Sequence, residues 1–253
     1  MARAAEARVV LLGESHDRAD HHLWQLSVLA GLAAQREDPA ADLVVGFEML
    51  PARADPVLAD WVADRLSEDA FLERTNWARV WGFPPALYLP LFHFCRMHRV
   101  PMVGLNCDRD LVRKVGAGGW EAVPETEREE ITPAAPATPD YRAYLFAMTG
   151  GRREGRAAQY PMDPAFDRFV RAQTTWDRAF ACRIVAARAR HGSSAPLVIG
   201  IIGRGHLEHR GGTPHQLADL GIPDATILLP VDAGAEIAPG IADAVFGLNA
   251  PGA

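Results

Sequence analysis

The chain has 253 residues, and its 49% hydrophobic and 23% charged content exclude wholesale disorder. A formal net charge of −6 leaves no basic surplus for neutralising phosphates, so we expect no nucleic-acid partner. Three cysteines exclude a disulfide framework, and no apolar run approaches the roughly 18 residues that a membrane span needs. Because no signal peptide or lipobox is recognisable, the expected location is the cytoplasm.

Short apolar runs alternate with longer helical patterns along the chain. Five runs predict buried strands, at residues 9–12, 43–48, 101–106, 197–202 and 226–229. Helical patterns cover residues 20–35, 55–66, 68–74, 85–98, 141–149 and 163–191. Strands that are apolar on both faces and separated by helices are typical of parallel sheets. The sequence therefore predicts an α/β fold, in which a mostly parallel open sheet is covered by helices.

The segment between the third and fourth predicted strands departs from this alternation. Residues 121–140 are rich in Glu, Pro and Ala, a composition typical of an extended connection. Two helical patterns follow it before the fourth strand. We interpret residues 1–253 as a single domain, in which residues 117–192 form a helical insertion. This insertion is expected to act as a lid over the C-terminal rim of the strands.

Polar side chains follow four of the five predicted strands, at the point where each of these strands ends. The first strand leads into Glu14 and His16, the second ends in Glu48, the third ends in Asn106, and the fourth leads into His206. Ligands of open parallel sheets bind beyond the carboxyl ends of the strands. Glycines precede both histidines and permit tight turns there. The sequence therefore predicts a functional cleft at this rim.

Two histidines and two carboxylates at one rim allow two kinds of chemistry. Glu14, His16, Glu48 and His206 are together a candidate site for a divalent metal. Without a metal, His16 is a candidate general base whose tautomer a glutamate fixes. A purely structural interpretation makes Glu14 and His16 no more than partners within the first turn. Arg204 and its neighbouring glycines are candidates for holding an anion.

Three other side chains near these motifs carry weaker patterns. His21 and His22 begin a predicted helix and are expected to be solvated. Tyr88 lies in a segment dense in aromatic residues, and the default interpretation is a packed tyrosine with a satisfied hydroxyl. The alternative is a phenolate ligand to ferric iron, because tyrosine is a known axial ligand of haem.

Seven short motifs occur in a fixed order, at residues 10–17 (VLLGESHD), 46–49 (GFEM), 77–83 (WARVWGF), 88–92 (YLPLF), 104–106 (GLN), 172–177 (AQTTWD) and 203–206 (GRGH). In this order they resemble the ChaN-like haem-binding uptake family. That family belongs to a wider group with the erythromycin esterases and the TraB/Tiki proteins. The resemblance covers roughly residues 8–231, which is nearly the whole chain.

The resemblance implies a protein that handles haem in iron acquisition. It implies haem bound between paired subunits, so a homodimer is expected. It also implies a tyrosine on the iron and a histidine at the propionates of the neighbouring haem. Tyr88 is the expected iron ligand because it lies in a family-typical segment, and His16, Arg204 and His206 are the other candidates for contact with the cofactor.

The wider group implies an alternative function as a hydrolase. In an esterase-like mechanism, His16 deprotonates water and Glu14 or Glu48 orients it, while His206 or Arg204 stabilises the developing oxyanion. In a metal-dependent mechanism, Glu14, His16, Glu48 and His206 surround Zn²⁺ or Mn²⁺ with one position open to water. Haem handling is the favoured hypothesis, with a hydrolase or a non-catalytic binding module as alternatives. Whether the protein is an enzyme stays open.

Overall fold

A single parallel sheet organises the protein. The computed structural model describes residues 4, 6–189 and 195–249. The sheet has the order β3-β2-β4-β1-β5-β6, and all neighbouring strands are parallel. The strands are β1 (Val9–Glu14), β2 (Leu43–Pro51), β3 (Met102–Asn106), β4 (Leu197–Gly203), β5 (Thr226–Asp232) and β6 (Ala244–Leu248). The predicted α/β fold class is confirmed. The sixth strand was not predicted, although its sequence AVFGL is apolar; it is a short edge strand of five residues, none of them fully buried.

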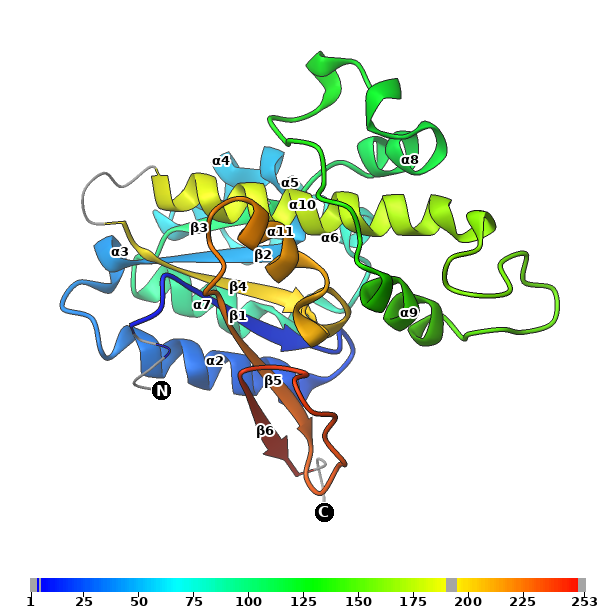
Figure 1. The fold of residues 1–253 in the computed structure, drawn as a ribbon. Helices are drawn as coiled ribbons and strands as arrows, with labels where there is room; N and C mark the ends of the chain where they lie inside the picture. Colours follow the sequence, from blue (N-terminus) through cyan, green and yellow to red (C-terminus); the bar gives the residue numbers. More distant parts are fainter. Residues whose placement is uncertain (1–3, 5, 190–194, 250–253) are drawn as a thin grey trace.

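Helices connect the strands and cover both faces of the sheet (Figure 1). They are α2 (Ala19–Ala33), α3 (Pro39–Asp42), α4 (Asp55–Val62), α5 (Glu68–Arg74), α6 (Trp77–Val80), α7 (Leu89–Met97), α8 (Arg109–Gly118), α9 (Pro139–Met148), α10 (Asp167–Ala189) and α11 (Thr213–Asp219). The predicted helix over residues 85–98 is divided, because a short 3₁₀ turn occupies residues 85–87. The last two residues of the predicted helix 163–191 lie outside the described ranges.

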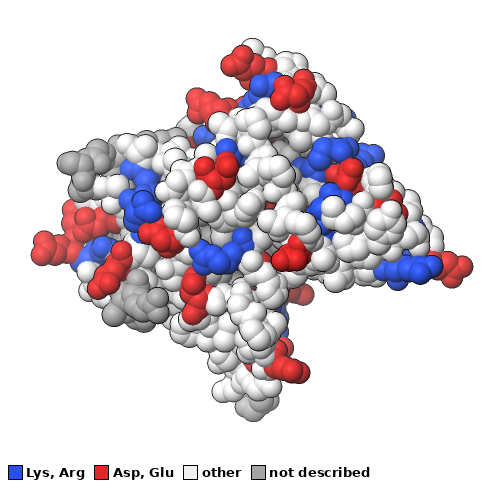
Figure 2. Space-filling view, in the orientation of Figure 1, with Lys and Arg blue, Asp and Glu red and all other residues white. Residues whose placement is uncertain are grey.

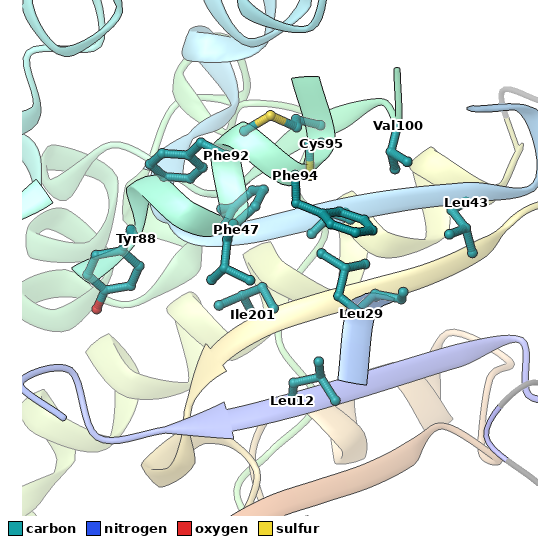
Figure 3. Close-up of a cluster of buried hydrophobic side chains, with 14 of the residues drawn as sticks. Leu12, Leu29, Leu43, Phe47, Tyr88, Phe92, Phe94, Cys95, Val100 and Ile201 are labelled. Atoms are coloured by element: carbon teal, nitrogen blue, oxygen red, sulfur yellow. The ribbon is translucent and has the colours of Figure 1, made fainter. Parts of the chain in front are cut away.

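The alternation of side chains along each strand divides the core into two layers. Val10, Phe47 and Ile201 face one side, where α2, α4 and α7 pack. Val9, Leu11 and Ile202 face the other side, where α8, α10 and α11 pack. Figure 3 shows part of the first layer, with Tyr88 at one end of the cluster. Burial on both faces explains why the strands read as continuous apolar runs.

The segment between β3 and β4 contains a core helix and an outer part. Phe180 and Ile184 of α10 are fully buried against the sheet, so this long helix belongs to the central fold. In contrast, α9 and residues 149–163 project beyond it (Figure 1). A small apolar cluster joins α9 to the start of α10. Tyr141 and Met148 of α9 lie against Gly211 and Gly205, which places α9 beside the end of β4.

Charge is finely mixed on the surface. On the face shown in Figure 2, acidic and basic side chains are interspersed without a broad field of either sign. Within the described ranges, no helix combines the length and the apolar content needed to cross a bilayer.

An irregularity between β2 and β3 brings two backbones unusually close. The register shifts between Phe47 and Pro51, so that Pro51 pairs with Asn106. Gly104 of β3 then faces the Pro51 and Leu50 carbonyl oxygens, which would lie 2.5 and 2.7 Å from a β-carbon at this position. Such bulges re-aim side chains near functional sites, and Glu48 lies within this irregular stretch.

We expect Gly104→Ala to lower the free energy of unfolding by about 1–3 kcal/mol, because rigid backbone leaves no room for the added methyl group. Urea denaturation of the variant and the parent protein measures the difference. Gly247→Ala is the matched control, since a β-carbon there would lie 3.5 Å from its nearest neighbour, an ordinary contact. Equal stability of the parent and the Gly104 variant would contradict the prediction.

Candidate functional site

The strand-end residues predicted from the sequence meet at one rim of the sheet. Glu14 ends β1, Glu48 lies in β2, and His206 belongs to the 3₁₀ turn Arg204–His206 that follows β4. Ligand atoms of Glu14, His16 and Glu48 lie within 4.8 Å of one another. His206 Nε2 lies 3.7 Å from Glu48 Oε1. The structure therefore brings all four residues together, because β4 lies between β1 and β2.

Glu14 is a buried carboxylate that accepts hydrogen bonds from three side chains. Its oxygens lie 2.7 Å from His16 Nδ1, 3.0 Å from His22 Nε2 and 3.2 Å from the Tyr88 hydroxyl. Burial by itself would raise the pKa of Glu14, but the hydrogen bonds from His16 and His22 outweigh it and hold the pKa below 4.5. Glu14 is therefore ionised and acts only as an acceptor.

His22 is a buried imidazolium cation. Its Nε2 faces Glu14 Oε2 and the His16 carbonyl oxygen, and its Nδ1 lies 3.1 Å from Gln25 Oε1. Gln25 uses its amide nitrogen to donate to the Leu12 and Gly13 carbonyls, so its oxygen is the atom that faces the ring. Both ring nitrogens thus face acceptors, and both must carry a proton. Burial lowers the pKa of His22, but the bond to Glu14 outweighs this and raises it above 6.5.

The expectation that His21 and His22 are solvated is wrong, because each is only 2% exposed. The first turn of α2 packs against the loop that follows β1, rather than facing solvent. His21 Nδ1 accepts a hydrogen bond from the backbone N–H of Ser15 at 3.0 Å. Burial lowers the pKa of His21, and its role as an acceptor keeps the ring neutral.

His16 points its free ring nitrogen into the site. Since Nδ1 donates to the ionised Glu14, Nε2 of the neutral ring carries the lone pair. The ring centroid lies 4.7 Å from that of Trp81 and 5.4 Å from that of Phe83, and the side chain is 32% exposed. A β-carbon at Gly203 would lie 2.6 Å from His16 Cε1, so a glycine is needed at this close approach.

His206 is held in the same way by a second buried carboxylate. Its Nδ1 lies 2.7 Å from Asp177 Oδ1, and Asp177 is fully buried in α10. Asp177 also accepts hydrogen bonds from the hydroxyls of Tyr141 and Thr213, at 2.8 and 3.2 Å. Burial lowers the pKa of His206, but the charges of Asp177 and Glu48 outweigh it and raise the pKa above 6.5.

Glu48 lies between the two histidines. Its Oε2 accepts the backbone N–H of Gly203 at 2.5 Å, and its Oε1 faces His206. Asn106 donates from its side-chain amide to the Glu48 carbonyl oxygen at 2.8 Å, which fixes the backbone of the irregular stretch of β2. Asn106, which the sequence placed at the rim, thus holds the backbone of Glu48 with its side-chain amide.

These residues line a cleft of about 1180 Å³. His16, Glu48 and His206 lie along its wall, and the aromatic side chains Trp81, Phe83 and Trp176 contribute apolar surface. Two imidazoles oriented by buried carboxylates, beside a third carboxylate, can bind a metal ion or exchange protons with a bound molecule.

Two predicted cofactor contacts lie outside the residues that line the cleft, Tyr88 and Arg204. Tyr88 is fully buried, and its hydroxyl donates to Glu14. Figure 3 shows that this hydroxyl points away from the labelled apolar side chains. Arg204 forms an ion pair with Glu208. Tyr88 therefore supports the site from within the core.

Sequence reasoning missed Asp177 and the charge of His22. Asp177 follows Gln173 by four residues and precedes Phe180 by three, so all three share one buried face of α10. A carboxylate on the apolar face of a helix is a sequence signal that could have identified it. The charge of His22 had no such signal, because it depends on the orientation of Gln25 and on contact with β1.

The titrating groups of the site predict how stability depends on pH. The raised pKa values of His16, His22 and His206 contribute stability that is complete below pH 6.5 and is lost as the pH rises through the folded-state values. The lowered pKa of Glu14 contributes stability above pH 4.5 that is lost as the pH falls through its folded-state value. We therefore expect the free energy of unfolding to be greatest between these limits.

Urea denaturation at about pH 6 and pH 8.5 measures this loss of stability. Ring-nitrogen NMR of His22 provides a direct check, with both nitrogens expected to be protonated at the lower pH. A free energy of unfolding that increases toward pH 8.5 would contradict the assignment of charges.

Comparisons with solved structures show that other proteins share this fold. The chain is similar to a structure describing cofacial haem binding to ChaN of Campylobacter jejuni, with a TM-score of 0.74 and 20% identity over 96% of this chain and 88% of that one. It is also similar to a mutant of the erythromycin esterase EreC in its open conformation, with a TM-score of 0.53 and 13% identity over 92% and 72% of the two chains. No curated protein matches the sequence.

The family model described as "Haem-binding uptake, Tiki superfamily, ChaN" matches residues 1–217. This match covers most of the chain and includes both histidines of the site and the carboxylates that orient them. The chain therefore belongs to the ChaN family of haem-binding uptake proteins in the Tiki superfamily.

Proposed function

We propose that the protein binds haem in the cleft at the rim of β1, β2 and β4, with His16 Nε2 as the iron ligand. The observation that carries this proposal is the orientation of His16, whose lone-pair nitrogen is available in the cleft while its other nitrogen is held by Glu14. Membership of a haem-binding family supports the choice of ligand. Aromatic walls beside the imidazole suit a flat macrocycle.

Tyr88 fits the role of iron ligand less well than His16. A phenolate ligand must lose its proton and reach the metal, whereas the Tyr88 hydroxyl is buried and donates to a carboxylate. Burial and the negative charge of Glu14 raise the pKa of Tyr88 and disfavour the phenolate. The His16 side chain already lies in the cleft, and its Nε2 can bind a metal once the ring is neutral, above its raised pKa.

The residues around His16 would tune a bound haem. Haem supplies a redox-active iron, and hydrogen bonding to the far nitrogen of an axial imidazole increases the basicity of that ligand. Glu14 makes such a bond, and His22 in turn keeps Glu14 ionised. Trp81 and Phe83 pack against the His16 ring and against each other.

A homodimer is part of this proposal. The structure of the Campylobacter protein is described as cofacial haem binding to ChaN. For this chain we propose that two clefts approach each other across a dimer when haem is bound. Light scattering of the protein with and without hemin tests this arrangement, and a monomer under both conditions would argue against it.

Hemin titration followed by absorption spectroscopy tests the role of His16. We expect His16→Ala to weaken binding by about ten-fold or more and to change the ligand-field bands, because the axial nitrogen is lost. Tyr88→Phe should leave those bands unchanged. His93→Ala, which removes an exposed histidine paired with Glu68, controls for non-specific binding. A spectrum altered by Tyr88→Phe and unaffected by His16→Ala would reverse the assignment.

The paired histidines and carboxylates favour a second candidate function, hydrolysis. Without a metal, an imidazole Nε2 could take a proton from a water molecule held by Glu48. In a metal-dependent version, His16 Nε2, Glu48 and His206 Nε2 would be the ligands, with Glu14 and Asp177 orienting the two imidazoles. Glu14 would then act outside the ligand set, because its oxygens are committed to three donors.

Elemental analysis of the purified protein and calorimetric titration with Zn²⁺ or Mn²⁺ test the metal-dependent version. We expect Asp177→Asn to weaken metal binding by about 10–100-fold, because His206 loses its orienting partner. His209→Asn is a control in the neighbouring turn, since its ring is exposed and asparagine tolerates its positive φ of 55°. Hydrolysis of an ester, amide and phosphoester panel that survives both His16→Ala and Glu48→Ala would exclude this catalytic assignment.

A further inference from the structure

The mouth of the cleft is positively charged although the chain as a whole is acidic. Five arginines and three acidic residues line the cleft, a surplus of two positive charges in a protein whose net charge is −6. The arginines are Arg53, Arg79, Arg109, Arg113 and Arg168. A local surplus of this kind attracts anions to the cleft.

Ion pairs within the cleft neutralise only two of its five arginines. Arg53 pairs with Asp108, and Arg113 pairs with Asp110 at 3.3 Å. The third acidic residue, Glu48, is engaged by Gly203 and His206 deeper in the cleft.

In the described part of the chain, the other three arginines of the cleft therefore have no carboxylate partner. Among the described residues, no acidic side chain forms an ion pair with Arg79, Arg109 or Arg168. These three guanidinium groups are available to a ligand.

The three arginines come from three different helices. Arg79 belongs to α6, Arg109 begins α8, and Arg168 lies in the first turn of α10. The Arg109 guanidinium donates to the Val80 carbonyl at 2.7 Å, which ties α8 to the end of α6 next to Arg79. The Arg168 backbone packs against Gly116 of α8.

We propose that Arg79, Arg109 and Arg168 form a recognition site for the carboxylate groups of the ligand. This inference rests on the proposed function, and it specifies a planar ligand with two carboxylates. Haem has this chemistry, with an apolar ring and two propionates on one edge. Trp81 and Trp176, which both line the cleft, would contact the ring, and the three arginines would bind the propionates. The planar guanidinium fork matches a carboxylate with two parallel hydrogen bonds.

Hemin and hemin dimethyl ester separate carboxylate recognition from binding of the ring. Both are titrated, in the same detergent buffer, into the parent protein and into an Arg79→Gln/Arg168→Gln double variant. We expect the parent to bind hemin about ten-fold more tightly than the diester, and the double variant to lose this preference while retaining affinity for the diester. Affinity for hemin should also decrease with added salt, and affinity for the diester should change little.

An Arg65→Gln/Arg74→Gln variant makes the same change of charge away from the cleft, where both side chains pair with Asp60. This control should keep the preference for hemin. Two results would overturn carboxylate recognition while leaving haem binding intact. One is equal affinity of the parent for hemin and the diester. The other is an equal loss of affinity for both compounds in the Arg79→Gln/Arg168→Gln variant. Failure of the parent to bind either compound would overturn the proposed function itself.

Discussion

The buried ion pair between Glu14 and His22 is the interaction on which the rest of the site depends. A carboxylate at the end of a central strand is costly to bury unless a cation and further hydrogen bonds compensate it. His22 supplies that cation from the first turn of α2, and Tyr88 supplies a hydrogen bond from the segment before α7. Glu14 then remains ionised and sets the tautomer of His16, which presents Nε2 to the cleft.

The order of the strands explains why four distant motifs form one site. Because β4 is inserted between β1 and β2, the carboxyl ends of these three strands are neighbours. Gly203 at the end of β4 donates its backbone N–H to Glu48 and leaves room for the His16 ring. A side chain at this glycine would push apart the two residues that the sheet brings together. The glycine is therefore as important to the geometry as the titrating groups.

Two similarly oriented histidines allow the cleft more than one kind of chemistry. His16 and His206 each have Nδ1 held by a buried carboxylate, and Glu48 lies between them. The same arrangement suits an axial ligand to haem iron, a divalent metal centre, or proton exchange with water. The cleft volume and its aromatic and basic lining are the observations that support the proposed ligand, which is large, flat and anionic.

The sequence alone determined the α/β class, five of the six strands and the set of residues at the strand ends. Hydrophobic periodicity is local, and the carboxyl-end rule needs no knowledge of strand order. Only the tertiary structure decided that the Tyr88 hydroxyl donates to Glu14, that His22 is charged, and that Asp177 pairs with His206. Tyr88 meets Glu14 across 74 positions and Asp177 meets His206 across 29. The partners of His22 are nearer in sequence, but they meet it only because α2 packs against the end of β1. No local pattern specifies which donor meets which acceptor, because packing of the helices on the sheet makes that choice.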